Sequence, residues 1–196
     1  MLCFIYRNWI AYFTLGAAVF LGNLSPSLAG TQNHKAHVHG NGKIDIALES
    51  PTKAIIELDF PGDSIFGFEH QARSAKDKQA EAQAFQKLRT QTDSIVQFDP
   101  SLGCQYKVNK VELEKEDHDA DQKAESSGGS KSEHHGEHAD VNASYEVNCA
   151  KPMTGSQIKV PMMTLFPKIK KISVQILKES GQTQKEISNA DEAISL

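Results

Sequence analysis

Histidines beside carboxylates are the residues of this chain with the clearest chemical potential. Seven of the eight histidines fall in two short stretches, the second of them rich in Asp and Glu: His34, His37 and His39, then His118, His134, His135 and His138. Imidazole with carboxylate, and without a thiolate cluster, suits a borderline divalent cation such as Zn²⁺, with Cu²⁺ and Ni²⁺ as competitors. The pattern therefore predicts metal binding. For His34 alone, an incidental position in a solvated segment is the better interpretation.

The spacing of the histidines indicates which of them can share an ion. On an extended segment, residues two apart point to the same side, so His37 and His39 can face one ion. Gly40 follows His39, and we expect it to give the chain a flexible exit from the site. His70 lies after a Phe-Glu pair and just before a predicted helix. It is either a further ligand or a surface histidine near the helix start, and the sequence weighs the two evenly.

The second stretch mixes an anchored histidine with freer ones. His138 directly precedes a predicted strand, whereas His118, His134 and His135 lie among Asp and Glu residues that offer overlapping ligand sets. Overlapping ligands on a segment that must be ordered on binding lower the affinity and favour exchange. That behaviour fits capture and hand-over of an ion better than catalysis.

Other kinds of chemistry have weaker support in the sequence. It contains no H-E-x-x-H, no G-x-S-x-G and no glycine-rich phosphate loop, so we expect no enzyme. A zinc-dependent hydrolase, with Glu69 as the base for a zinc-bound water, is the least favoured alternative. Copper handling is another, because Met153, Met162 and Met163 are soft ligands, although Met162 and Met163 lie among apolar residues typical of a core.

The first 29 residues predict export. Arg7 precedes an apolar stretch over residues 9–21, and segment 1–29 ends in Ser-Leu-Ala, small residues that a signal peptidase reads. We expect cleavage before Gly30 and no stable membrane insertion afterwards, because an apolar run of about 13 residues is shorter than the roughly 20 of a membrane span. The sequence therefore predicts a periplasmic protein whose residues 30–196 form one domain.

Cys104 and Cys149 are the two cysteines that remain after this cleavage. An even number in an exported protein favours one disulfide, which would tie off the base of the second His stretch. Thiolate ligation of zinc is the less favoured alternative, because the sequence has no C-x-x-C pair. The net charge of −4, with no basic stripe, argues against nucleic acid as a partner.

Alternation of apolar and polar residues predicts the strands that position these side chains. Residues 44–48 and 53–60 are expected to form an antiparallel hairpin. Residues 103–113 and 139–149 are expected to form a second hairpin with a bulge near Asn109. The His-bearing segment 114–138 is then a long insertion at the tip of this hairpin, unable to bury apolar area and mobile without metal.

Ser74 has the character of a helix N-cap, and helical spacing continues to about residue 90. A short strand is expected at 157–160, and Ile172, Val174 and Ile176 predict a later strand with one buried face. We therefore predict an α+β fold: a mostly antiparallel sheet, one main helix over about 74–90, and a long His and acidic loop inserted in a hairpin.

The order of several motifs resembles a known family. The chain carries a leader, His-x-His-Gly before a strand, Phe-Glu-His, a Gly-Cys strand start, a His/Asp/Glu-rich loop closing in His-Ala-Asp, a strand ending in Cys, and a late Phe-Pro. In this order and spacing they resemble the ZrgA-like periplasmic zinc-binding proteins. The resemblance covers essentially the whole mature chain.

The resemblance implies a zinc-regulated periplasmic protein that binds Zn²⁺ and assists its uptake, alongside an ABC-type zinc importer and the solute-binding component of that importer. A zinc or copper buffering module without an importer partner is the alternative. The metal positions that the family motifs mark are His37, His39, His70, His118, His134, His135 and His138. The loop itself departs from the family pattern, because residues 126–130 stand where further His-Asp repeats are common, so the number of ions stays open.

Overall fold

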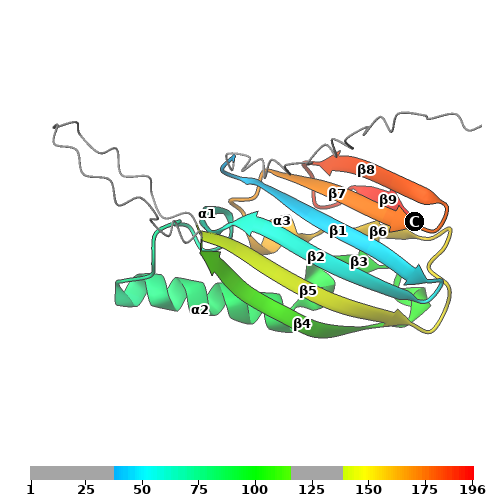
Figure 1. Cartoon of the computed structure of the whole chain (residues 1–196), viewed down its shortest axis with the longest axis horizontal. Helices are drawn as coiled ribbons and strands as arrows, with labels where there is room; N and C mark the ends of the chain where they lie inside the picture. The colour runs from blue at the N-terminus through cyan, green and yellow to red at the C-terminus, as the bar shows by residue number, and fades with distance from the viewer. Residues whose placement is uncertain (1–37, 116–138) are drawn as a thin grey trace, which may run out of the picture. The chain divides into compact units, whose positions relative to one another are not determined.

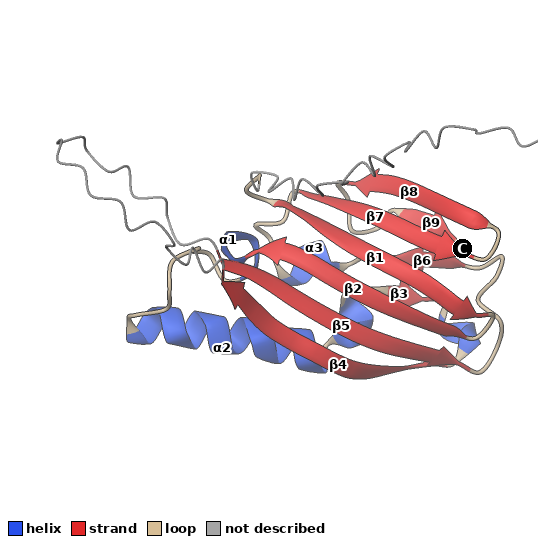
Figure 2. Ribbon diagram, in the orientation of Figure 1, coloured by secondary structure: helices blue, strands red, loops and turns tan. Residues whose placement is uncertain are grey.

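The computed structural model describes residues 38–115 and 139–196, and Figures 1 and 2 show the arrangement of their strands and helices. The strands are β1 (Asn41–Ser50), β2 (Lys53–Pro61), β3 (Gln97–Phe98), β4 (Cys104–Lys115), β5 (Ala139–Cys149), β6 (Gln157–Lys159), β7 (Lys171–Lys178), β8 (Gly181–Ile187) and β9 (Ala193–Ser195). The helices are α1 (Gly62–Ile65), α2 (Ala75–Thr90) and α3 (Met162–Leu165). The predicted signal peptide and residues 116–138 of the predicted loop lie outside the described residues.

Six strands form the main sheet, in the order β4-β5-β2-β1-β7-β8, and β3-β6-β9 form a small second sheet. Every neighbouring pair in the main sheet is antiparallel except β1 and β7, which run parallel. The two predicted hairpins are therefore confirmed as β1–β2 and β4–β5, and β2 pairs with β5 to join them. A register shift between Val108 and Lys110 confirms the predicted bulge.

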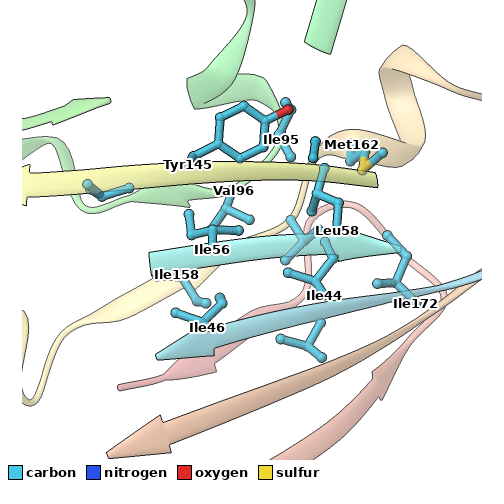
Figure 3. Packing of buried hydrophobic residues seen from close by; sticks show 14 of the residues in the cluster. Ile44, Ile46, Ile56, Leu58, Ile95, Val96, Tyr145, Ile158, Met162 and Ile172 are labelled. Carbon is cyan, nitrogen blue, oxygen red and sulfur yellow. The ribbon is translucent and has the colours of Figure 1, made fainter. Parts of the chain in front are cut away.

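One face of the main sheet is buried, because its apolar residues alternate with polar ones along each strand. Ile44 and Ile46 of β1 are fully buried, and Ile172 of β7 is too. Figure 3 shows these side chains packed with residues from the chain segments behind the sheet, including Ile158 of β6. The second sheet and the helices therefore cover the apolar face of the main sheet.

The long helix α2 is held to the sheet by two side-chain hydrogen bonds. The Tyr145 hydroxyl on β5 donates to the Leu88 carbonyl over 3.0 Å, and the Arg89 guanidinium donates to the Val111 carbonyl of β4 over 3.1 Å. Ala84 and Leu88 are the buried residues of the helix. Desolvation raises the pKa of Tyr145 above its ordinary value, so this hydroxyl stays a proton donor to the helix.

Ser74 caps α2 as predicted. Its hydroxyl accepts from the Asp77 backbone N–H over 3.0 Å, and the Asp77 carboxylate accepts from the Ser74 backbone N–H over 3.2 Å. Hydrogen bonds from Ser74 hold the pKa of Asp77 below its usual value. Replacing Ser74 by alanine leaves a helical N–H without its acceptor, so we expect the free energy of unfolding to fall by about 1 kcal/mol.

Urea unfolding of the S74A variant beside the wild type measures this loss. Ser74→Asp is the matched control, because aspartate at the N-cap also accepts from the helix and should keep most of the stability. An S74A variant as stable as wild type would mean that the cap contributes nothing.

The predicted fold class is wrong in two respects. Strands make up 47% of the structure and helices 22%, so the protein is mostly β rather than α+β. The main sheet is mixed, since β1 and β7 are parallel, and a second sheet is present that we did not expect. Alternation reveals which face of a strand is buried, but it carries no information on strand direction.

Two further observations concern the predicted bridge and the membrane. The predicted disulfide between Cys104 and Cys149 is present and joins residues 45 apart in the sequence. Within residues 38–115 and 139–196, no helix is long and apolar enough to cross a membrane.

Candidate functional site

The turn that carries His39 and the strand ends that flank segment 116–138 lie at one end of the main sheet, where β1 and β5 begin and β2 and β4 end (Figure 1). We call this the His39 end. Pro61, the last residue of β2, pairs with Asp140, and Lys115, the last of β4, pairs with Ala139. The two described residues that flank segment 116–138 therefore lie at the same end of the sheet as His39.

The turn that carries His39 is fixed by backbone hydrogen bonds at Gly40. The Gly40 N–H donates to the Ser64 hydroxyl over 3.1 Å, and the Gly40 carbonyl accepts from the Lys170 and Lys171 N–H groups over 2.7 and 3.1 Å. Gly40 has φ +81°, and a Cβ there would lie 3.1 Å from the Lys168 carbonyl oxygen. Gly40 is thus part of a rigid turn rather than the flexible exit that we expected, and this turn fixes the backbone beside His39.

His39 faces two carboxylates. Its Nδ1 atom is 3.5 Å from Asp63 Oδ2 and 3.4 Å from Glu69 Oε1. Both separations are longer than an ordinary N–H···O hydrogen bond of about 2.7–3.2 Å. They match the distance between two ligands of a tetrahedral zinc ion, about 3.4 Å for Zn–N and Zn–O bonds of about 2.0–2.2 Å. The side chain of His39 is 69% exposed, so an ion from solvent can reach it.

Lys168 holds the other oxygen of Asp63. Its ammonium is 3.0 Å from Asp63 Oδ1 and donates to the Gly67 carbonyl over 3.1 Å. Lys168 belongs to the segment between α3 and β7, and Asp63 belongs to α1. One carboxylate is therefore shared between an imidazole and an ammonium from distant parts of the sequence.

The start of β5 packs directly against α1. A Cβ on Gly62 would lie only 2.8 Å from the Ala139 carbonyl oxygen, so this close approach of two backbones requires glycine. His138, which precedes Ala139, lies outside the described residues. The described neighbour Ala139 nevertheless stands beside the helix that carries Asp63.

His70 has its own set of contacts. Its ring stacks on Phe68, with centroids 4.9 Å apart and planes 17° from parallel. Its Nδ1 is 2.9 Å from the Gln71 carbonyl oxygen, which can only accept, so Nδ1 carries the proton and Nε2 is the nitrogen with the lone pair in a neutral ring. A backbone carbonyl is a common orienting partner of metal-binding histidines.

Two of the seven predicted ligands, His39 and His70, belong to the part of the chain that the structure describes, and the others lie outside it: His37, His118, His134, His135 and His138. Across residues 38–115 and 139–196, no group of three or more His, Cys, Asp or Glu side chains is arranged to hold a metal ion. His39 meets each carboxylate pairwise, and Lys168 occupies one side of Asp63. These described residues therefore do not make a metal site by themselves, and a site that included His39 would need ligands from elsewhere in the chain.

Sequence reasoning missed Asp63 and Lys168. Asp63 was visible only as part of a Pro-Gly-Asp strand end, and Lys168 gave no signal because it is 105 residues from Asp63 in the sequence. Copper handling would require methionine sulfur atoms that an ion from solvent can reach. Met153 and Met162 are both 0% exposed and belong to the core, so their sulfur atoms are not presented to an ion from solvent, whereas Met163 is half-buried and packs against the core.

Comparison with known proteins adds a finding that covers every described residue. A family model described as ZrgA family zinc uptake protein matches residues 36–196. No curated protein matches the chain.

Proposed function

Because the chain belongs to the ZrgA family of zinc uptake proteins, we propose that it captures Zn²⁺ in the periplasm and assists its uptake by passing the ion to the solute-binding component of an ABC importer. One observation carries the proposal: the His39 imidazole faces Asp63 and Glu69 over 3.5 and 3.4 Å at the end of the sheet that flanks the second His stretch. The family is described as one of zinc uptake proteins and is not a known enzyme family.

In this proposal His39 is the anchored ligand. Zinc usually takes four ligands, and His39 with one carboxylate supplies two. His37 is two residues from His39 in the sequence. His138 directly precedes β5, whose first residue Ala139 lies beside the helix that carries Asp63. We propose that these two histidines complete the site. His70 is the remaining candidate, because its Nδ1 contact with the Gln71 carbonyl leaves Nε2 for metal.

The loop histidines have a separate role. His118, His134 and His135 lie among carboxylates in a segment with few apolar residues, where binding must order the chain. We propose that they hold further ions loosely and exchange them with the anchored site. The zinc is cargo here, and a site that releases its ion suits uptake better than a closed structural site.

Replacing His39 by alanine tests the proposal. The variant removes the imidazole that faces both carboxylates, so we expect the tightest zinc site to weaken by at least the roughly 10–100-fold that the loss of a ligand's orienting partner causes. Calorimetric titration with zinc, with a chelator of known affinity as competitor, measures this loss.

Glu179→Gln is the matched control, because Glu179 lies in the turn between β7 and β8, at the other end of the sheet, and its loss should leave the affinity unchanged. Wild-type affinity in the H39A variant would contradict the proposed site. Transfer of bound zinc from the wild type to an importer's solute-binding protein would separate uptake from buffering. A buffering protein should release zinc to a small chelator of equal affinity as fast as to that solute-binding protein, whereas an uptake protein should transfer it faster to the solute-binding protein.

A further inference from the structure

Two nitrogen-bearing side chains face the Asp63 carboxylate, one at each of its oxygens. The Lys168 ammonium lies 3.0 Å from Oδ1, and the His39 imidazole lies 3.5 Å from Oδ2. The side chain of Asp63 is only 26% exposed, so solvent screens these contacts less than it would screen those of a fully exposed carboxylate. The charge of the Lys168 side chain at Asp63 Oδ1 therefore affects the affinity of an ion that binds at Asp63 Oδ2, beside His39.

The backbone holds Lys168 in this position. Its ammonium also donates to the Gly67 carbonyl over 3.1 Å, and a Cβ on Gly67 would lie 3.3 Å from the same ammonium nitrogen. Gly67 has φ +102°, a conformation that favours glycine. The ammonium is thus seated against the turn between α1 and His70, with two acceptors in place.

We propose that the Lys168 ammonium competes with zinc for Asp63, and thereby lowers the affinity and speeds the release of the ion that His39 holds. The inference rests on the zinc-binding role of His39 proposed above. The negative charge of Asp63 would attract a divalent ion at the His39 side, and the Lys168 ammonium offsets that charge. A divalent ion is therefore attracted less strongly than it would be without the ammonium.

The consequence suits an uptake protein. When zinc leaves, the ammonium retains Asp63 as its partner, so the carboxylate does not pass through a state without a counter-charge. Zinc therefore leaves a carboxylate that already has a counter-charge. An ammonium in this place acts on the dissociation rate more than on the association rate, because it is already paired when zinc arrives from solvent.

Lys168→Met tests the inference, since methionine keeps an unbranched side chain and removes the charge. We expect the K168M variant to bind zinc about three- to tenfold more tightly than the wild type at low ionic strength. The difference in affinity between the two proteins should become smaller as the salt concentration increases. Dissociation after mixing with excess chelator, followed by stopped flow, should slow by a similar factor. The Lys168→Arg variant keeps the charge and should stay near the wild-type affinity.

Lys170→Met is the matched control. Its ammonium belongs to the same segment but donates to the Pro167 carbonyl over 2.9 Å rather than to a carboxylate. Unchanged affinity in K168M, or the same gain in K168M and K170M, would overturn the inference. So would weaker binding in K168M, because Lys168 would then position Asp63 for the metal. A failure of the proposed function has a different signature, namely wild-type zinc affinity in H39A.

Discussion

Replacing Cys104 and Cys149 together by alanine is expected to lower the free energy of unfolding by about 4 kcal/mol. The bridge links residues 45 apart in the sequence, so it removes much of the freedom of the unfolded chain. It joins the first residue of β4 to the last residue of β5, which are also paired in the sheet. Urea unfolding of the oxidised wild type and of the double variant measures the loss.

Zinc binding provides the second readout for this variant. The bridge closes the end of the β4–β5 hairpin opposite the Lys115–Ala139 pair, and it does not tie off the base of the His segment as the sequence suggested. The folded double variant should therefore bind zinc with wild-type affinity. The wild type in reductant is the matched control and should lose the same stability. A zinc affinity that falls with the bridge would show that this distant end of the hairpin shapes the site.

All strands of the main sheet except β8 (Gly181–Ile187) could be predicted, because each of the five carries its own evidence. Ile44 and Ile46 alternate with polar residues, and so do Ile172, Val174 and Ile176; all five are buried. The same holds for α2, whose N-cap Ser74 has a capping-box partner three residues later. Local sequence signals of this kind do not depend on where the rest of the chain lies.

The pairing of distant segments could not be predicted in the same way. The parallel contact of β1 with β7 brings Asn41 beside Lys171, and nothing in either strand specifies the direction. The second sheet is built from strands of two or three residues; the short strand expected at 157–160 is confirmed as β6, but β3 and β9 are too short for any periodicity to show. Phe98 of β3 and Ile194 of β9 are buried, but they appeared in the sequence only as isolated apolar positions.

In the candidate site, too, local features could be predicted from the sequence and contacts between distant segments could not. His39 stands out by residue type and by spacing, and chemistry alone predicts that it binds an ion. Its partners Asp63 and Lys168 are ordinary charged residues in the sequence, and they meet only because β2 ends and β7 begins at the same end of the sheet. Sequence therefore identifies the candidate ligand, whereas the fold supplies the charges around it.

Replacing Gly40 by alanine is expected to damage both the fold and the site. A residue with a Cβ at φ +81° is strained, and this Cβ would lie 3.1 Å from the Lys168 carbonyl oxygen. We expect the free energy of unfolding to fall by about 2–3 kcal/mol. Zinc affinity should fall by about tenfold or more, because the turn that fixes His39 must shift and ligand geometry sets affinity.

Gly155 offers a matched control for this prediction. It has φ +79°, nearly the same as Gly40, but a Cβ there would meet nothing within 4 Å. Gly155→Ala should therefore show the cost of the backbone conformation alone, about 1–2 kcal/mol, and leave zinc affinity intact. Because the two glycines share one conformation and differ in surroundings, the difference between the variants isolates the contact of Gly40 with the Lys168 segment. Equal zinc affinities in G40A and G155A would mean that the His39 turn does not position a zinc ligand, even if G40A were the less stable of the two.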